Sequence, residues 1–124
     1  MTEVNKTVVK RYIEEVINQG RLDLIDPFFK PEIREQVRGF LTQENNPFAD
    51  THEEIQDIVA EGNKVMVRFL FEGVHQGEFL GIPATKKRIE ITGYATYYLE
   101  NGQIIWDTVC FDWLDALEQL GTKF

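Results

Sequence analysis

The sheet of this protein is clearest in residues 88–111, which read RIEITGYATYYLENGQIIWDTVCF. Two runs rich in β-branched and aromatic residues, 88–99 and 103–111, flank the pair Asn101-Gly102. This composition favours strands, and an Asn-Gly pair tolerates the positive φ angles of the type I′ turn that joins antiparallel strands. We therefore predict a long β-hairpin with its turn at this pair.

Two further strands are predicted just before this hairpin. From Glu54 to Ala60 apolar and polar residues alternate, and Gly62-Asn63 then turns the chain. Such alternation between turn residues is typical of strands. Residues 64–74 carry apolar side chains at both parities, which indicates a strand with two largely covered faces.

Helical periodicity marks both ends of the chain. Residues 3–19 carry an apolar stripe at helical spacing, a short helix is predicted through 22–26, and a last helix over 112–120. Residues 33–53 show no clear period, and we expect a loop with one or two helical turns. Helices kept apart from consecutive strands indicate an α+β fold, in which a curved antiparallel sheet has the helices on its concave face.

Length and charge limit what this protein can bind. At 124 residues the chain has the size of one domain, and we predict a single domain over residues 1–124. Thirteen basic residues against twenty-one acidic ones give a net charge of −8, which disfavours nucleic acid and anionic membranes as partners. We see no secretory signal and no membrane-spanning apolar run, and therefore expect a cytoplasmic protein.

The sequence shows no signature of a cofactor. Cys110 is the only cysteine, and the two histidines, His52 and His75, do not give the spacing of a zinc site. We expect Cys110 to be a small buried side chain in a strand. There is no glycine-rich phosphate loop and no nucleophile motif. We therefore expect a protein that works without metal or cofactor.

Two segments resemble a known family. Residues 73–87, GVHQGEFLGIPATKK, are similar to the pattern G-T-H-x-G-E-F-x-G-I-P-P-T-G-K of the SnoaL-like polyketide cyclases, within the nuclear transport factor 2-like superfamily. Residues 58–68, IVAEGNKVMVR, resemble the strand-turn-strand of the same family. The resemblance covers residues 4–30 and 54–121.

The resemblance implies an α+β cone that holds a hydrophobic, polyketide-like carbonyl compound and pairs with a second copy through the exposed face of its sheet. Characterised members close polyketide rings by intramolecular aldol condensation without a cofactor, which needs a base that removes a proton beside a carbonyl group. We therefore expect a homodimeric cyclase, isomerase or lyase. The alternatives are a non-catalytic module that binds a small molecule, and a dimeric interaction domain of the same fold.

Two carboxylates are candidates for that base. The family's last strand often reads G-K-I-V-E-H-W-x-x-x-D, and the ungapped match to residues 102–112 puts Asp107 at its histidine and Asp112 at its aspartate. Alternation places Asp107 on one strand face with Ile105, Val109 and Phe111, and burial on that face would raise its pKa. The alternatives are a solvent-facing Asp107 and an Asp112 that only caps the last helix.

Six further side chains are expected to line the pocket. Tyr94 and Tyr98 share one strand face and would present hydroxyl groups to a substrate, or else fill the core as aromatics with a polar tip. Arg68, among apolar residues, needs a partner such as Asp107 or Glu90 if it is buried. The predicted substrate-binding residues are Tyr12, Phe40, Arg68, Tyr94, Tyr98 and Trp106.

Overall fold

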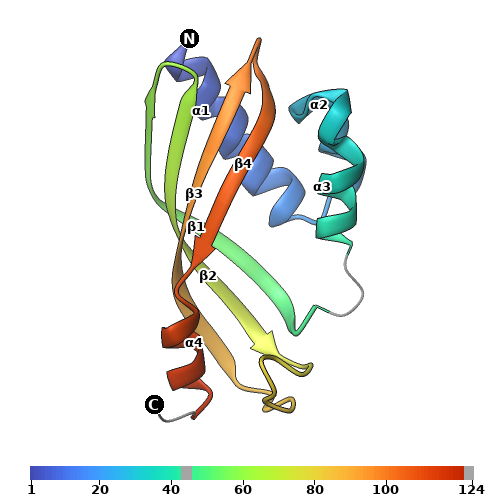
Figure 1. Cartoon of the computed structure of the whole chain (residues 1–124), viewed down its shortest axis with the longest axis vertical. Helices are drawn as coiled ribbons and strands as arrows, with labels where there is room; N and C mark the ends of the chain where they lie inside the picture. Colours follow the sequence, from blue (N-terminus) through green and yellow to red (C-terminus); the bar gives the residue numbers. More distant parts are fainter. Residues whose placement is uncertain (43–45, 122–124) are drawn as a thin grey trace.

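The computed structural model of the protein describes residues 1–42 and 46–121. It contains one four-stranded antiparallel sheet in the order β1-β2-β3-β4, so each strand pairs with its neighbours in sequence (Figure 1). The strands are β1 (Phe48–Glu61), β2 (Lys64–His75), β3 (Arg88–Glu100) and β4 (Gln103–Phe111). Together with the helices that flank it, this sheet confirms the predicted α+β fold.

Both predicted two-residue turns are present. Glu100 pairs with Gln103 across Asn101-Gly102, whose φ angles are +52° and +75°. Two positive φ angles in succession are the mark of the type I′ turn, which matches the twist of the two strands. The β1–β2 turn has its only positive φ angle, +60°, at Gly62, the arrangement of a type II′ turn.

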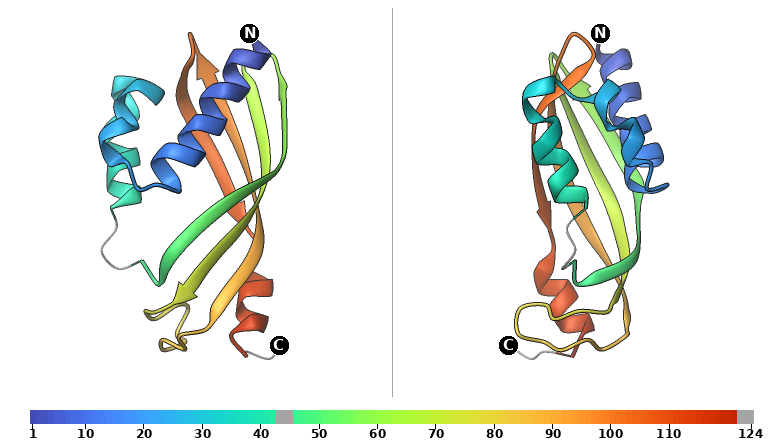
Figure 2. Two further views of the ribbon diagram at one scale, coloured as in Figure 1. Left: turned by 180° about the vertical axis from the view of Figure 1, so that it is seen from behind. Right: turned by 90° about the vertical axis from the view of Figure 1, so that its right-hand side faces the viewer.

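Helices precede and follow the sheet. They are α1 (Thr2–Arg11), η1 (Tyr12–Ile17), η2 (Leu22–Leu24), α2 (Ile25–Phe28), η3 (Pro31–Ile33), α3 (Arg34–Leu41) and α4 (Trp113–Gln119). The strongly curved sheet carries α1 and α3 on one side (Figure 2). The helix α1 packs against β1, β2 and β4, and α4 packs against the far end of β3. The concave side is therefore covered at one end by helices from the first third of the chain.

The predicted helix over residues 3–19 changes its hydrogen bonding halfway. α1 is an α-helix, but η1 is a π-helix, and the N–H of Asn18 donates to the carbonyl of Ile13, five residues back, at 2.9 Å. Such wide turns are rare and occur frequently at functional sites. This one places Tyr12, Ile13 and Val16 among the buried side chains.

The core lies between the concave face of the sheet and the first helices. Its fully buried side chains include Val9, Ile13, Ile25, Phe29, Val65, Phe69, Ile91 and Ile104. Phe69 fits only because residue 93 is glycine: a Cβ atom there would come within 2.5 Å of its ring. The missing side chain lets a large ring lie flat on the neighbouring strand.

Residues 33–53 agree with the prediction only in part. The eight-residue helix α3 makes about the two helical turns expected there. β1, however, begins at Phe48 rather than at Glu54. Residues 43–45 of this segment lie outside the described part of the chain. The start of β1 is polar over 50–54 and pairs with a single neighbour, and its register shifts twice along β2. These shifts break the period-two pattern from which a strand is predicted.

Candidate functional site

A cavity of about 320 Å³ opens on the concave side between η1, α3, β1, β3 and β4. We call it the polar cavity, because four ionisable side chains lie on its wall: Tyr12, Glu53, Tyr97 and Asp107. The rest of the wall is largely apolar, and it includes Ile17, Phe40, Phe69, Val109 and Phe111. An apolar wall with a few polar groups is typical of sites that bind small organic molecules.

Asp107 enters this cavity from β4. It stands opposite Tyr97 in the β3–β4 register, so both side chains belong to the concave face. Asp107 is partly buried, and this burial raises the pKa of its carboxyl group. A carboxylate with a raised pKa is a stronger base than one in water.

Glu53 is the second carboxyl group of the polar cavity, and the sequence prediction missed it. It is buried more deeply than Asp107, and burial raises its pKa to about 7. Asn18 holds this stretch of β1 in place: its amide donates to the carbonyl of Glu53 and accepts from the N–H of Glu53, both at 2.8 Å. The prediction that Asp107 is the most buried carboxylate is therefore wrong.

Two tyrosines complete the ionisable set. Tyr12 is held edge-on against Phe29, with ring centroids 4.9 Å apart, and its ring lies 6.0 Å from that of Tyr97. Burial raises the pKa of both tyrosines, and the nearby Asp107 and Glu53 raise it further. Both hydroxyl groups therefore keep their protons at any physiological pH and can donate hydrogen bonds.

A second cavity, of about 430 Å³, adjoins the first. We call it the aromatic cavity, because rings from β1, β2, β4 and α4 surround it: Phe48, Phe71, Phe79, Phe111 and Trp113. The ring of Trp113 is nearly parallel to that of Phe48, with centroids 6.2 Å apart, and it stacks on Phe111 at 4.8 Å. Ile17, Phe40, Glu53 and Phe111 line both cavities, so the two lie side by side.

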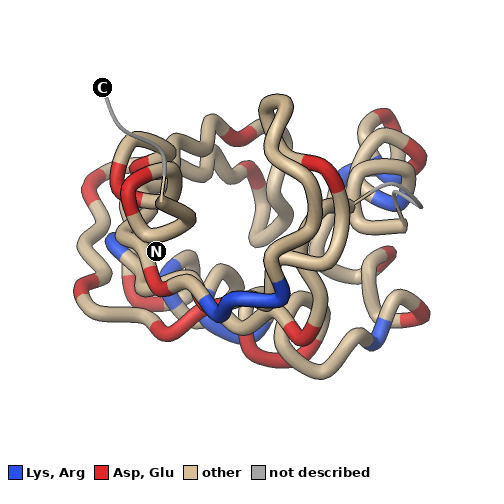
Figure 3. The backbone as a smooth tube through the Cα atoms, turned by 90° about the horizontal axis from the view of Figure 1, so that it is seen from below, with Lys and Arg blue, Asp and Glu red and all other residues tan. Residues whose placement is uncertain are grey.

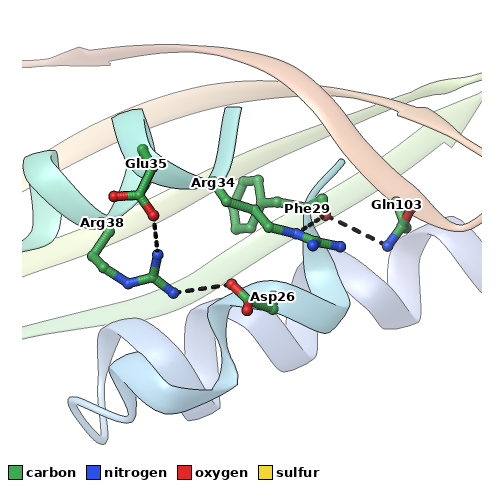
Figure 4. A network of polar contacts seen from close by, with 6 residues as sticks. All are labelled: Asp26, Phe29, Arg34, Glu35, Arg38 and Gln103. Carbon is green, nitrogen blue, oxygen red and sulfur yellow. Dashed lines mark hydrogen bonds and ion pairs between the residues drawn. The ribbon is translucent and has the colours of Figure 1, made fainter. Parts of the chain in front are cut away.

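The helix α3, which forms the outer wall, is fixed by a polar network (Figure 4). Arg34 and Gln103 both donate to the carbonyl of Phe29, at 2.9 and 3.4 Å, which ties α3 to β4. Arg38 bridges Glu35 and Asp26 at 2.7 and 2.9 Å. Phe40 follows on the same helix and remains 67% exposed, so it stands at the mouth of both cavities.

Tyr94, Tyr98 and Arg68 lie on the opposite face, which we call the outer face of the sheet. Tyr97 between the two tyrosines points inward, so alternation turns its neighbours outward, and Tyr94 is 55% exposed. Arg68 pairs with Asp57 at 3.0 Å, not with Asp107 or Glu90. The expectation that these three side chains line the interior is therefore corrected. Tyr97 is the interior tyrosine of this strand.

The other predicted residues also have definite places. Trp106 is 55% exposed but contributes to the rim of the polar cavity, and Tyr12 lies inside it. Asp112 caps α4 by accepting from the N–H of Asp115 at 3.1 Å, and it lines neither cavity. Cys110 is exposed, contrary to prediction, because it stands opposite Tyr94 on the outer face.

The outer face has a shallow groove of about 440 Å³ across its centre. Its apolar members include Val59 and Met66, which are 60% and 54% exposed. Tyr94 and Cys110 continue the groove toward β4. Exposed apolar side chains that lie next to one another at the centre of a sheet are typical of an interaction surface.

Neither a patch of one charge nor a cluster of metal ligands marks a second site within residues 1–42 and 46–121. Acidic positions occur on helices and strands all around the fold when it is seen along its long axis (Figure 3). Within those residues, no three His, Cys, Asp or Glu side chains come together as a metal site would require. Nor does any helix there have the length and apolar character needed to cross a membrane.

Several solved structures have the same fold. IdmH from Streptomyces antibioticus, proposed to be a polyketide cyclase, superimposes with a TM-score of 0.82 at 24% identity, over 95% of this chain and 99% of that one. A proposed SnoaL-like polyketide cyclase from Jannaschia sp. CCS1 gives 0.84 at 20% identity, over 99% and 95%. TsrD from Streptomyces laurentii gives 0.78 at 25% identity, over 96% of each chain.

Sequence comparison gives the family. Among curated proteins no match was found. The sequence model of the SnoaL-like polyketide cyclases, however, matches residues 7–120, which is almost the whole chain. The four-stranded antiparallel sheet and its flanking helices agree with this match. The chain belongs to the SnoaL-like polyketide cyclase family.

Proposed function

We propose that this protein is a cofactor-free enzyme of the cyclase, isomerase or lyase type, in which Asp107 acts as the general base on a hydrophobic carbonyl compound. One observation carries the proposal: Asp107 lies in the polar cavity among largely apolar side chains, opposite the buried Tyr97, and its pKa is raised. A partly desolvated carboxylate beside hydrogen-bond donors has the composition needed to form and hold an enolate.

The proposed chemistry begins with the Asp107 carboxylate, which takes a proton from a carbon beside the substrate carbonyl. The electron pair of that C–H bond forms a C=C bond, and the carbonyl π pair moves to oxygen. The hydroxyl groups of Tyr12 and Tyr97 donate hydrogen bonds inside the same cavity and stabilise the negative oxygen. The enolate carbon then attacks a second carbonyl group of the same molecule and closes a ring, and the new alkoxide takes the proton held by Asp107. The surrounding wall holds the two carbons close together.

The shape of the cavities supports a substrate with several carbons and at least one flat, apolar part. The polar cavity holds every ionisable side chain of the site, while the aromatic cavity supplies the stacked rings of Phe111 and Trp113. An elongated polyketide-like molecule would place its reacting carbonyl near Asp107 and an unsaturated part against the rings. The names of the structural relatives favour the same class of substrate.

The test uses 2-tetralone, a two-ring ketone with acidic C–H positions beside its carbonyl. In D₂O the protein should accelerate exchange of these protons, which is measured by NMR, and binding is measured separately by Trp fluorescence. If 2-tetralone binds but does not exchange faster than in buffer, the protein is a binding module instead.

We also propose that the outer face forms a homodimer interface. The groove with Val59, Met66 and Tyr94 supports this, because such apolar exposure is costly in a monomer. Sedimentation at tens of micromolar should give the dimer mass for the wild type and the monomer mass for Met66→Lys. Leu80→Lys is a matched control, since Leu80 is even more exposed than Met66 but lies outside the strands of the sheet. A monomeric wild type would contradict the proposal.

A further inference from the structure

The proposed reaction leaves one ionisable group of the site without a role. Glu53 lines both the polar and the aromatic cavity, so it stands where the two meet. Its backbone N–H and carbonyl both bond to the side-chain amide of Asn18, each at 2.8 Å. A residue held in this way on a strand has a better defined position than a residue in a loop.

The carboxyl group of Glu53 has no hydrogen-bond or ion-pair partner among the residues that the structure describes. The ionisable groups that face it are Tyr12 from η1, Tyr97 from β3 and Asp107 from β4, and none of them is a cation. Burial of an acid without a cation favours the protonated form. Near neutral pH a large fraction of Glu53 therefore carries a proton, since its pKa is about 7.

Two acids in one cavity with unequal environments divide the work of acid–base catalysis, the more deeply buried one serving as the acid. We propose that Glu53 is a second catalytic residue of this site, the acid that protonates the substrate oxygen while Asp107 removes the carbon-bound proton. This inference rests on the proposed function and names the partner that the base requires.

The step balances as follows for ring closure. Asp107 takes the proton from carbon, the C–H pair becomes the C=C bond, and the carbonyl oxygen receives the Glu53 proton, which gives a neutral enol. When the enol carbon attacks the second carbonyl, a C–C bond forms and the enol O–H proton returns to Glu53. The new alkoxide takes the proton held by Asp107. Both carboxyl groups end in the state in which they began.

The experiment compares Glu53→Gln with Glu54→Gln in the 2-tetralone exchange assay from pH 5 to 9. Glu54 is the exposed neighbour on the same strand and lines neither cavity, so it is the matched control. Glu53→Gln should lower the exchange rate at pH 6 by about 10²-fold, because glutamine cannot transfer a proton. The loss of rate that the wild type shows above pH 7 should disappear. Glu53→Asp should restore part of the rate.

Two further measurements separate chemistry from binding and from folding. Binding of 2-naphthol, an aromatic enol, should change less than threefold in Glu53→Gln. Infrared spectra of the wild type at pH 6 should contain a protonated carboxyl band that Glu53→Gln lacks. If Glu53→Gln keeps its exchange rate and pH profile, or loses 2-naphthol binding as much as exchange rate, the role of Glu53 is overturned while the proposed function still stands. A wild type without exchange would overturn the proposed function and this inference together.

Discussion

The two faces of the sheet stabilise their acidic side chains in different ways. On the outer face, Asp57 is paired with Arg68, and Glu72 with Arg88 at 2.6 Å. On the concave face, no ion pair with Glu53 or Asp107 occurs within residues 1–42 and 46–121. Each of these two outer carboxylates contacts an arginine, whereas Glu53 and Asp107 contact no cation in the described part of the chain and are partly shielded from water. The same residue types are therefore ion pairs on one face and candidates for proton transfer on the other.

The sharpest test of this contrast is Asp107→Asn. We expect the 2-tetralone exchange rate to fall by about 10²-fold or more, because asparagine cannot act as a base. Thermal stability should be equal or higher, since a buried carboxylate without a cation is costly. Asp112→Asn is the matched control: asparagine caps helices as well as aspartate does, so rate and stability should persist. Loss of rate in the control instead would move the base to Asp112.

The next test concerns stability against pH. The pKa of Glu53 is about 7 in the fold, above its value in the unfolded chain. Between the two values the folded protein holds more protons, so this stabilisation is present at low pH and is lost as the pH rises through about 7. Glu53→Gln lacks this dependence. Urea unfolding at pH 5 and pH 8 should show the wild type losing up to about 3 kcal/mol relative to the variant. A constant difference would show that Glu53 is ionised throughout.

A smaller effect is expected at the turn Asn101-Gly102, which holds β3 and β4 in register. Gly102→Val should lower the free energy of unfolding by about 1 kcal/mol or more, because a β-branched residue resists a positive φ angle. The φ angle of Gly102 is +75°. Gly39→Ala, in the exposed helix α3, meets no neighbouring atom and should not destabilise the protein. Equal melting temperatures for Gly102→Val and the wild type would contradict this prediction.

The smallest effect should come from the outer face. Asp57→Asn removes the partner of Arg68 at an exposed site, and exposed ion pairs contribute little to stability because water screens them. The melting temperature should hardly change, and the exchange rate of 2-tetralone should not change at all. A loss of rate comparable to that of Asp107→Asn would show that the two faces are not independent.

Much of the sheet could be predicted because its strands follow simple rules. The pair Asn101-Gly102 predicts a type I′ turn, and the turn has that geometry. The alternation of β4 predicts that Asp107 shares a face with Ile105, Val109 and Phe111. The register confirms this for Val109 and Phe111, but a bulge at Ile105 interrupts the alternation there. What alternation does not give is which face is concave when both are apolar. Tyr94 and Tyr98 were therefore assigned to the interior, where Tyr97 stands instead.

The position of Glu53 was harder to predict than that of Tyr97. It lies in the polar start of β1, where bulges interrupt the pattern and no turn residue marks the strand. Counting back by two from Ile55 would have placed Glu53 on the face of that residue, a signal present in the sequence. Tyr12, which lies near Glu53, is the first residue of the π-helix η1, and no local sequence pattern predicts this type of hydrogen bonding.

The amide of Asn18 has one further consequence, for the behaviour of the protein in a crowded solution. β1 and β4 are the edge strands, and the free backbone groups of an edge invite strand addition by another chain. At Glu53 the Asn18 amide occupies both backbone groups, as an incoming strand would. On β4, the backbone N–H of Lys30 donates to the carbonyl of Ile104 at 3.0 Å. At these two positions the edges are therefore closed to strand addition by another chain.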